Sequence, residues 1–125
     1  MLFRRRIMSE KEFTEENDEL NQLSMNILVH AGNAREQLVQ SLNKLEEEEF
    51  AEAEEKIKLA KKEIVVAHGL QTDTLQLEAA GEQIRYSTLF GHAQDTLMTV
   101  QSEILLGGHL IRLFRKIDQK FEEDK

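Results

Sequence analysis

The chain has 125 residues with 24 acidic and 16 basic side chains, which gives a formal net charge of −8 at pH 7. This length suits a single domain, and the acidic balance argues against nucleic acid as a partner. Cysteine is absent, which excludes disulfides, thiolate ligands and a thiol nucleophile. Proline is absent too, and aromatic residues are few, so the composition favours long helices over strands.

The N-terminal segment does not predict a signal peptide. Met1 to Ile7 are basic and apolar, but polar residues from Ser9 onward stand where the apolar core of a signal peptide would lie. No apolar run approaches the roughly 20 residues that cross a bilayer. We expect a cytoplasmic protein in which residues 1–16 form a disordered extension, residues 17–121 the folded domain and residues 122–125 a frayed tail.

The first predicted helix begins near Asn17, where apolar residues start to recur at steps of mostly three and four. These residues are Leu20, Leu23, Ile27, Leu28, Ala31, Ala34, Leu38, Leu42 and Leu45. Glycine inside a helix costs roughly 1 kcal/mol relative to alanine, so we expect Gly32 to permit the close approach of another helix or of a partner. The acidic run from Glu46 to Glu49 predicts a solvated connection.

The second predicted helix begins near Phe50 and stops at Gly81. Its expected buried positions are Ala53, Ile57, Ala60, Ile64 and Ala67, followed by Leu70 or Gln71, Leu75 and Ala79. Uncharged polar groups interrupt this apolar pattern between Ala67 and Gln76. If they are buried, they must pair with one another or with a partner.

The third predicted helix has Ser87 as its N-cap and extends to about Phe121. Its expected buried residues are Leu89, Phe90, Ala93, Leu97, Val100, Ile104, Leu105, Ile111, Phe114 and Ile117. The pair Gly107-Gly108 indicates either a bend or close packing. Short connections predict an antiparallel up-down-up three-helix bundle, and the wide apolar surface of the third helix predicts self-association.

The candidate chemistry is concentrated around His92. Asp95, Thr96 and Thr99 follow it at spacings that place all four side chains on one helical face. The sequence has no Glu-x-x-His pairs for a bundle metal site and no strand-borne serine elbow, which leaves direct nucleophilic attack by the imidazole. His68 either lines the same site or makes ordinary core hydrogen bonds. We interpret His30 as structural and His109 as a surface or packing residue.

Three segments resemble the enzyme IIA component of the lactose/cellobiose (N,N′-diacetylchitobiose) family of the bacterial phosphotransferase system. They are the stretches 27–35, 67–72 and above all 91–99, which reads Gly-His-Ala-Gln-Asp-Thr-Leu-Met-Thr. The resemblance covers roughly residues 17–117. It departs from the family pattern at Gly91, Thr96 and the stretch 107–109, which bears on the straightness of the third helix.

The resemblance implies a cytoplasmic homotrimer of three-helix bundles. Such a protein would accept a phosphoryl group from the carrier protein HPr on His92 and pass it to a cysteine of the IIB component, in the uptake of a β-disaccharide such as cellobiose or lactose. It also implies that Asp95 binds a structural divalent cation on the trimer axis. Because the ligands would be carboxylate oxygens, the expected cation is Mg²⁺. Gln94, Gln71 and His68 would orient the imidazole or the phosphate.

Two other interpretations are open at this point. In the first, the chain is a non-catalytic helical scaffold or interaction protein in which His92 and Asp95 satisfy each other. In the second, it is a bundle metalloenzyme, which the missing ligands disfavour.

Overall fold

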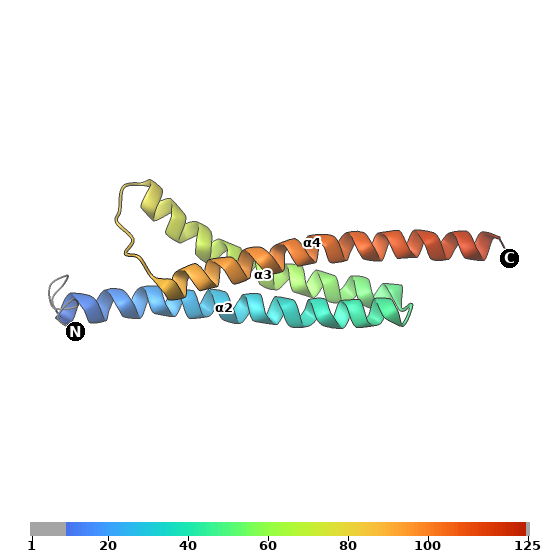
Figure 1. The fold of residues 1–125 in the computed structure, drawn as a ribbon, viewed down its shortest axis with the longest axis horizontal. Helices are drawn as coiled ribbons and strands as arrows, with labels where there is room; N and C mark the ends of the chain where they lie inside the picture. The colour runs from blue at the N-terminus through green and yellow to red at the C-terminus, as the bar shows by residue number, and fades with distance from the viewer. Residues whose placement is uncertain (1–9, 125) are drawn as a thin grey trace.

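The computed structural model describes the backbone of residues 10–124 and the side chains of residues 19–124. Within these residues there are three helices and no strand: α2 (Glu10–Glu46), α3 (Phe50–Ala79) and α4 (Thr88–Glu123). The helices form a long, thin bundle in which α3 is antiparallel to α2 and α4 (Figure 1). The predicted all-α, up-down-up three-helix bundle is therefore confirmed.

The two ends of the bundle are connected differently (Figure 1). At one end a tight turn joins α2 to α3, and the C-terminal part of α4 extends past this turn. At the other end, an irregular segment leads from α3 to the start of α4. Helix α2 begins at Glu10, earlier than the predicted Asn17, and α4 ends at Glu123, slightly later than predicted. Residues 1–9 of the predicted extension lie outside the described residues.

Local chemistry explains where the helices end. Glu48, in the acidic connection, has a φ of 62°, and Lys44 holds the turn through Glu47 at 3.3 Å and Glu52 at 3.2 Å. The hydrogen bond to Glu52 is the main reason that the pKa of Lys44 is raised, and Glu47 adds to it. Beyond α3, Gly81 has a φ of 102°, a conformation that favours glycine.

The N-terminus of α4 is capped as predicted. The Ser87 hydroxyl accepts a hydrogen bond from the Phe90 backbone nitrogen at 3.1 Å. This bond satisfies one of the donors that the first helical turn leaves unpaired. The cap thus fixes where α4 starts, and with it the position of His92.

The core consists of small and branched side chains from all three helices. Its fully buried or nearly buried members include Ile27, Ala34, Leu38, Ala53, Ile57, Ala60, Ile64, Ala67, Ala93, Leu97, Val100, Ile104 and Ile111. The five leading positions predicted for the second helix are all buried. In its later part Gln71 is buried, which was one of the two predicted alternatives, and Thr74 continues the core. The prediction was wrong for Leu75 and Ala79, which are exposed.

Helix α4 exposes much more apolar surface than its periodicity predicted. Leu105, Phe114 and Ile117 were expected to be buried, yet they are 63%, 47% and 38% exposed. Leu105 points away from the core, and the other two lie level with the α2–α3 turn, where they line an open groove. Leu106, Leu110, Leu113 and Ile117 form what we call the outer stripe of α4, since their spacing places them on one side of the helix.

The glycines inside the helices differ in their surroundings. Gly107 lies at a close helix contact, because a Cβ there would be 2.9 Å from Leu38 Cδ1 and 3.3 Å from Ile57 Cδ1. Helix α4 continues through it, so close packing is the correct alternative of the two predicted for this pair. For Gly32, packing against a helix of the same chain is wrong, since nothing lies within 4 Å of a Cβ built there.

None of the described helices is both long and apolar enough to cross a membrane.

Candidate functional site

His92 lies in the second turn of α4, and its side chain is exposed. In the part of the chain that the structure describes, its imidazole makes no hydrogen bond or ion pair. The one hydrogen bond at this residue is made by its backbone, whose carbonyl accepts from Thr96 Oγ1 at 2.9 Å. Both ring nitrogens are therefore available to an external group.

Asp95 lies one turn further along α4 and is also exposed. Its carboxylate has no partner among the described residues, and its backbone carbonyl accepts from Thr99 Oγ1 at 2.7 Å. The two threonine hydroxyls are thus bonded to the α4 backbone and not to the imidazole or the carboxylate. The four residues share one face of α4, as predicted, but their side chains do not form hydrogen bonds with one another.

The described side chains of one chain do not form a complete metal site. Residues 19–124 contain no group of three or more His, Asp or Glu side chains that could hold an ion. Asp95 would therefore need ligands from other molecules to hold a cation. Its free carboxylate is compatible with such a role, since oxygen ligands suit Mg²⁺.

Gln71 and Gln94 form a hydrogen bond between α3 and α4 near His92. Gln71 is only 6% exposed, and its Nε2 donates to Gln94 Oε1 at 3.2 Å. The bond answers the question of how a buried polar group in the second half of α3 is satisfied. It also holds the Gln94 side chain toward α3. His92 is two residues away on the same helix, and side chains at this spacing point in different directions.

Helix α4 has two flanks that face different neighbours. We call the side of Gln94 the α3 flank, and the side of Glu103 the α2 flank because Glu103 pairs with Arg35 of α2 at 3.0 Å. At about 100° per residue, His92 lies close to the direction of Glu103 and far from that of Gln94. Within one chain, His92 is therefore on the α2 flank and turned away from Gln94 and Gln71.

The other histidines are placed as follows. His68 of α3 is exposed, and its Nδ1 lies 3.3 Å from Thr72 Oγ1. It makes no hydrogen bond to His92 within the described chain. His30 Nδ1 donates to Glu63 Oε2 at 2.7 Å and links α2 to α3, which agrees with the structural role predicted for it. Sequence reasoning missed Glu63, because contacts between separate helices leave no local pattern.

His109 and Tyr86 are two further exposed rings on or next to α4. His109 accepts from Arg112 Nη2 at 2.9 Å on the exposed surface, as expected of a surface residue. Tyr86 lies in the segment just before α4 and is 89% exposed. It is the only tyrosine, and the chain has no tryptophan. Tyr86 was not singled out from the sequence, where nothing marks a lone aromatic residue in a loop.

The sequence matches the model of the family described as PTS system, Lactose/Cellobiose specific IIA subunit, over residues 22–115. The chain is 41% identical over 99 residues to the lactose-specific EIIA component of Staphylococcus epidermidis, a match that covers 79% of this chain and 95% of that protein. It is 32% identical over 104 residues to the lichenan-specific phosphotransferase enzyme IIA component of Bacillus subtilis, covering 83% and 94%.

A solved structure is similar over nearly the whole length. The crystal structure of the PTS cellobiose-specific enzyme IIA from Bacillus anthracis aligns with a TM-score of 0.76 and 31% identity. The alignment covers 93% of this chain and 98% of that one. The likeness thus extends over the three helices and the segment that carries His92.

Proposed function

The chain belongs to the lactose/cellobiose-specific IIA family of the phosphotransferase system and is a phosphotransferase component, and from this premise we propose that it is a cytoplasmic phosphohistidine carrier. It accepts a phosphoryl group from phospho-HPr on His92 and passes it to a cysteine of the IIB component. The observation that carries the proposal is the exposed imidazole of His92, which has no hydrogen-bond partner among the described residues. An imidazole in this state is open to a partner protein and free to act as a nucleophile.

The chemistry requires little more than position. Neutral His92 attacks phosphorus through the lone pair of Nε2 while Nδ1 keeps its proton. The P–N bond to the histidine of HPr breaks as the new P–N bond forms. The IIB thiolate then attacks phosphorus, the second P–N bond breaks and the imidazole is restored. Phosphoryl transfer of this kind depends on alignment and electrostatic stabilisation.

The transported sugar is proposed from relatives only. The similar proteins are named for lactose, lichenan and cellobiose, which share β-glycosidic linkages. We assign this chain to the uptake of a β-linked disaccharide. The sugar meets the membrane component of the system and not this chain, so no residue here selects it.

We also propose that the carrier works as a homotrimer around the outer stripe of α4. At 100° per residue, Asp95 points in the same direction as Leu106 and Leu113, opposite the core. Three copies packed on this side bury the exposed leucines and bring three Asp95 carboxylates together. Such a cluster must take up protons or a cation, and Mg²⁺ would be held there by Asp95 from each copy.

A cyclic trimer also explains how the separated candidates meet. In a ring, the α2 flank of one α4 faces the α3 flank of the next. His92 of one copy then lies toward Gln94, Gln71 and His68 of its neighbour, which can orient the imidazole or the phosphate. The Gln71–Gln94 bond supports this role by fixing one of these amides in place.

The test is phosphorylation in vitro. The purified chain is incubated with enzyme I, HPr and phosphoenolpyruvate, and intact mass spectrometry follows the sample before and after mild acid. We expect the addition of one acid-labile phosphoryl group, which then disappears when IIB is added. A chain that stays unmodified while HPr is phosphorylated would instead support the non-catalytic helical scaffold.

A further inference from the structure

The last three turns of α4 carry opposite charges on their two flanks. Lys116 and Lys120 are one turn apart and share the α3 flank, whereas Asp118 lies between them in sequence and points to the α2 flank. None of these three residues forms an ion pair within the described chain, where the nearby Arg115 pairs with Glu54 at 2.6 Å. All three lie beyond residue 115, where the family match ends.

On the α2 flank, the end of α4 and the α2–α3 turn enclose a groove of about 390 Å³. It is lined by Leu45, Glu46, Glu48, Phe50, Phe114, Ile117, Asp118 and Phe121. The groove thus combines an apolar floor with a rim of three carboxylates. Glu46 and Glu48 are exposed and, like Asp118, have no ion-pair partner among the described residues. A positively charged side chain with an apolar stem has the chemistry that this groove favours.

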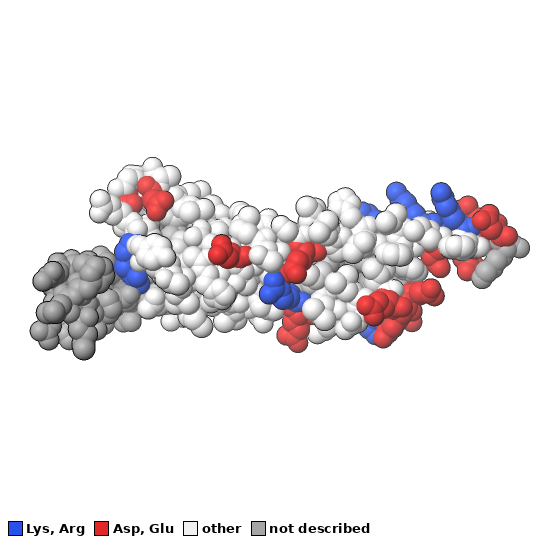
Figure 2. Space-filling model, viewed as in Figure 1, with Lys and Arg blue, Asp and Glu red and all other residues white. Residues whose placement is uncertain are grey.

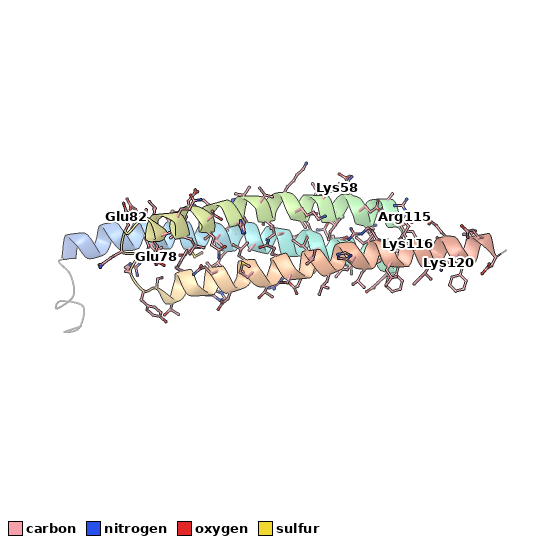
Figure 3. The ribbon with its side chains drawn as sticks, turned by 90° about the horizontal axis from the view of Figure 1, so that it is seen from above. Lys58, Glu78, Glu82, Arg115, Lys116 and Lys120 are labelled. Atoms are coloured by element: carbon pink, nitrogen blue, oxygen red, sulfur yellow. The ribbon has the colours of Figure 1, made fainter. Side chains whose placement is uncertain are left out.

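The lysines and the groove lie at the same height along the bundle. Helices α2 and α4 are parallel, and the contact between Arg35 and Glu103 sets their register. Glu46 therefore lies level with residues 114–116 of α4. Figure 2 shows acidic side chains over the α2–α3 turn, and basic side chains over the C-terminal part of α4 with acidic ones at its very end. Figure 3 places Lys116 and Lys120 on that part of α4.

We propose that the groove of one copy receives Lys116 and Lys120 of the next copy of this chain. The lysine stems pack on the phenylalanines of the groove and their ammonium groups pair with its carboxylates, so that three such contacts close a ring. The inference rests on the proposed homotrimer and adds a second, charge-paired contact to the outer stripe. A contact between two different patches, repeated by rotation, is the arrangement that closes into a ring.

The test uses two double variants and their combination. Lys116→Glu/Lys120→Glu makes both flanks acidic, and Glu46→Lys/Asp118→Lys makes both basic. We expect each to raise the concentration at which the trimer dissociates about tenfold in low salt, and less at high salt. The quadruple variant has the net charge of the natural chain and restores complementarity. It should assemble like the natural chain in sedimentation velocity.

Two outcomes separate this contact from a general charge effect. If only net charge mattered, Glu46→Lys/Asp118→Lys would strengthen association by making the chain less negative, whereas the proposal predicts weakening. In addition, the natural chain and the quadruple variant should form mixed trimers in clearly less than statistical proportions in native mass spectrometry, because every contact between the two kinds of chain places like charges together. Mixed trimers in statistical proportions, or double variants that assemble normally because the groove serves another protein, would overturn the proposal.

Phosphorylation provides the independent readout. Lys116 is about 36 Å from His92 along α4, so His92 of the double variants should still be phosphorylated by HPr whenever enough protein is present to assemble. Failure of the charge test with normal phosphorylation overturns the groove contact alone. Failure of phosphorylation in the natural chain overturns the proposed function. A natural chain that is monomeric overturns the groove contact.

Discussion

At the scale of single residues, His92 is distinguished from the other histidines by what it lacks. His30 is paired with Glu63 and His109 with Arg112, whereas the imidazole of His92 has no partner within the described chain. We expect His92→Gln to abolish phosphorylation by phospho-HPr and to leave helical content unchanged by circular dichroism. His109→Gln, an exposed position on the same helix, is the matched control and should be phosphorylated normally. Labelled phosphate that persists on His92→Gln would contradict the assignment.

The Gln71–Gln94 bond gives a second prediction at this scale. Gln94→Leu leaves the buried amide of Gln71 without its partner, which should lower the free energy of unfolding by about 1–3 kcal/mol. In Gln71→Leu/Gln94→Leu the unpaired group is gone, so we expect part of this loss to be recovered. Urea unfolding at a fixed protein concentration measures both values. Equal destabilisation of the single and double variants would show that the bond contributes little.

At the scale of the helices, the neighbouring glycines of α4 allow a matched comparison. A Cβ at Gly108 has Arg112 Nη1 at 3.5 Å as its nearest neighbour, an ordinary contact, so Gly108→Ala should gain up to about 1 kcal/mol in helix propensity. A Cβ at Gly107 would be 2.9 Å from the buried Leu38. We therefore expect Gly107→Ala to lose about 1 kcal/mol through overpacking. Thermal unfolding of both variants checks the difference, and equal stabilisation would contradict the close contact.

The helices show how far the sequence alone can be read. The buried positions of α3 up to Ala67, the stop at Gly81 and the cap at Ser87 were predictable, because periodicity and capping act within a few residues of chain. The exposure of Phe114 and the choice of Gly107 over Gly32 as the packed glycine were not. They depend on the register between helices and on their relative lengths. The recurrence of apolar residues extends over a longer stretch in the third helix than in the other two. This was the one available signal that the end of the helix would be exposed.

The candidate site, like the helices, could be predicted from the sequence only in part. The spacing in residues 91–99 singled out His92 and Asp95 as candidates, and the structure places both side chains on the exposed surface of α4. The sequence could not show that Gln94 turns toward Gln71, because these two residues lie on different helices, 23 positions apart in sequence. It also could not show that His92 points away from Gln94 and Gln71. That separation depends on how α2, α3 and α4 are arranged around the core.

At the scale of the whole molecule, the role proposed for Asp95 links metal content to assembly. We expect Asp95→Ala and Asp95→Leu both to lose the bound divalent cation, since each removes the proposed carboxylate ligand. Asp95→Leu should retain the trimer, because its side chain extends the apolar contact of the outer stripe, and Asp95→Ala should weaken it. Elemental analysis measures the metal, and sedimentation equilibrium measures the assembly. If Asp95→Ala changes neither, Asp95 is not at the axis.

Tyr86 gives this protein a built-in optical reporter. As the only tyrosine in a chain without tryptophan, it dominates the emission on excitation near 280 nm, and it lies just before the helix that carries His92. A docked protein that shields its exposed ring would change its quenching by acrylamide or iodide. Binding at the His92 end can therefore be titrated with the unlabelled natural chain against a partner that lacks tryptophan and tyrosine. Contacts at the far end of the bundle, which involve phenylalanines, would leave this emission unchanged.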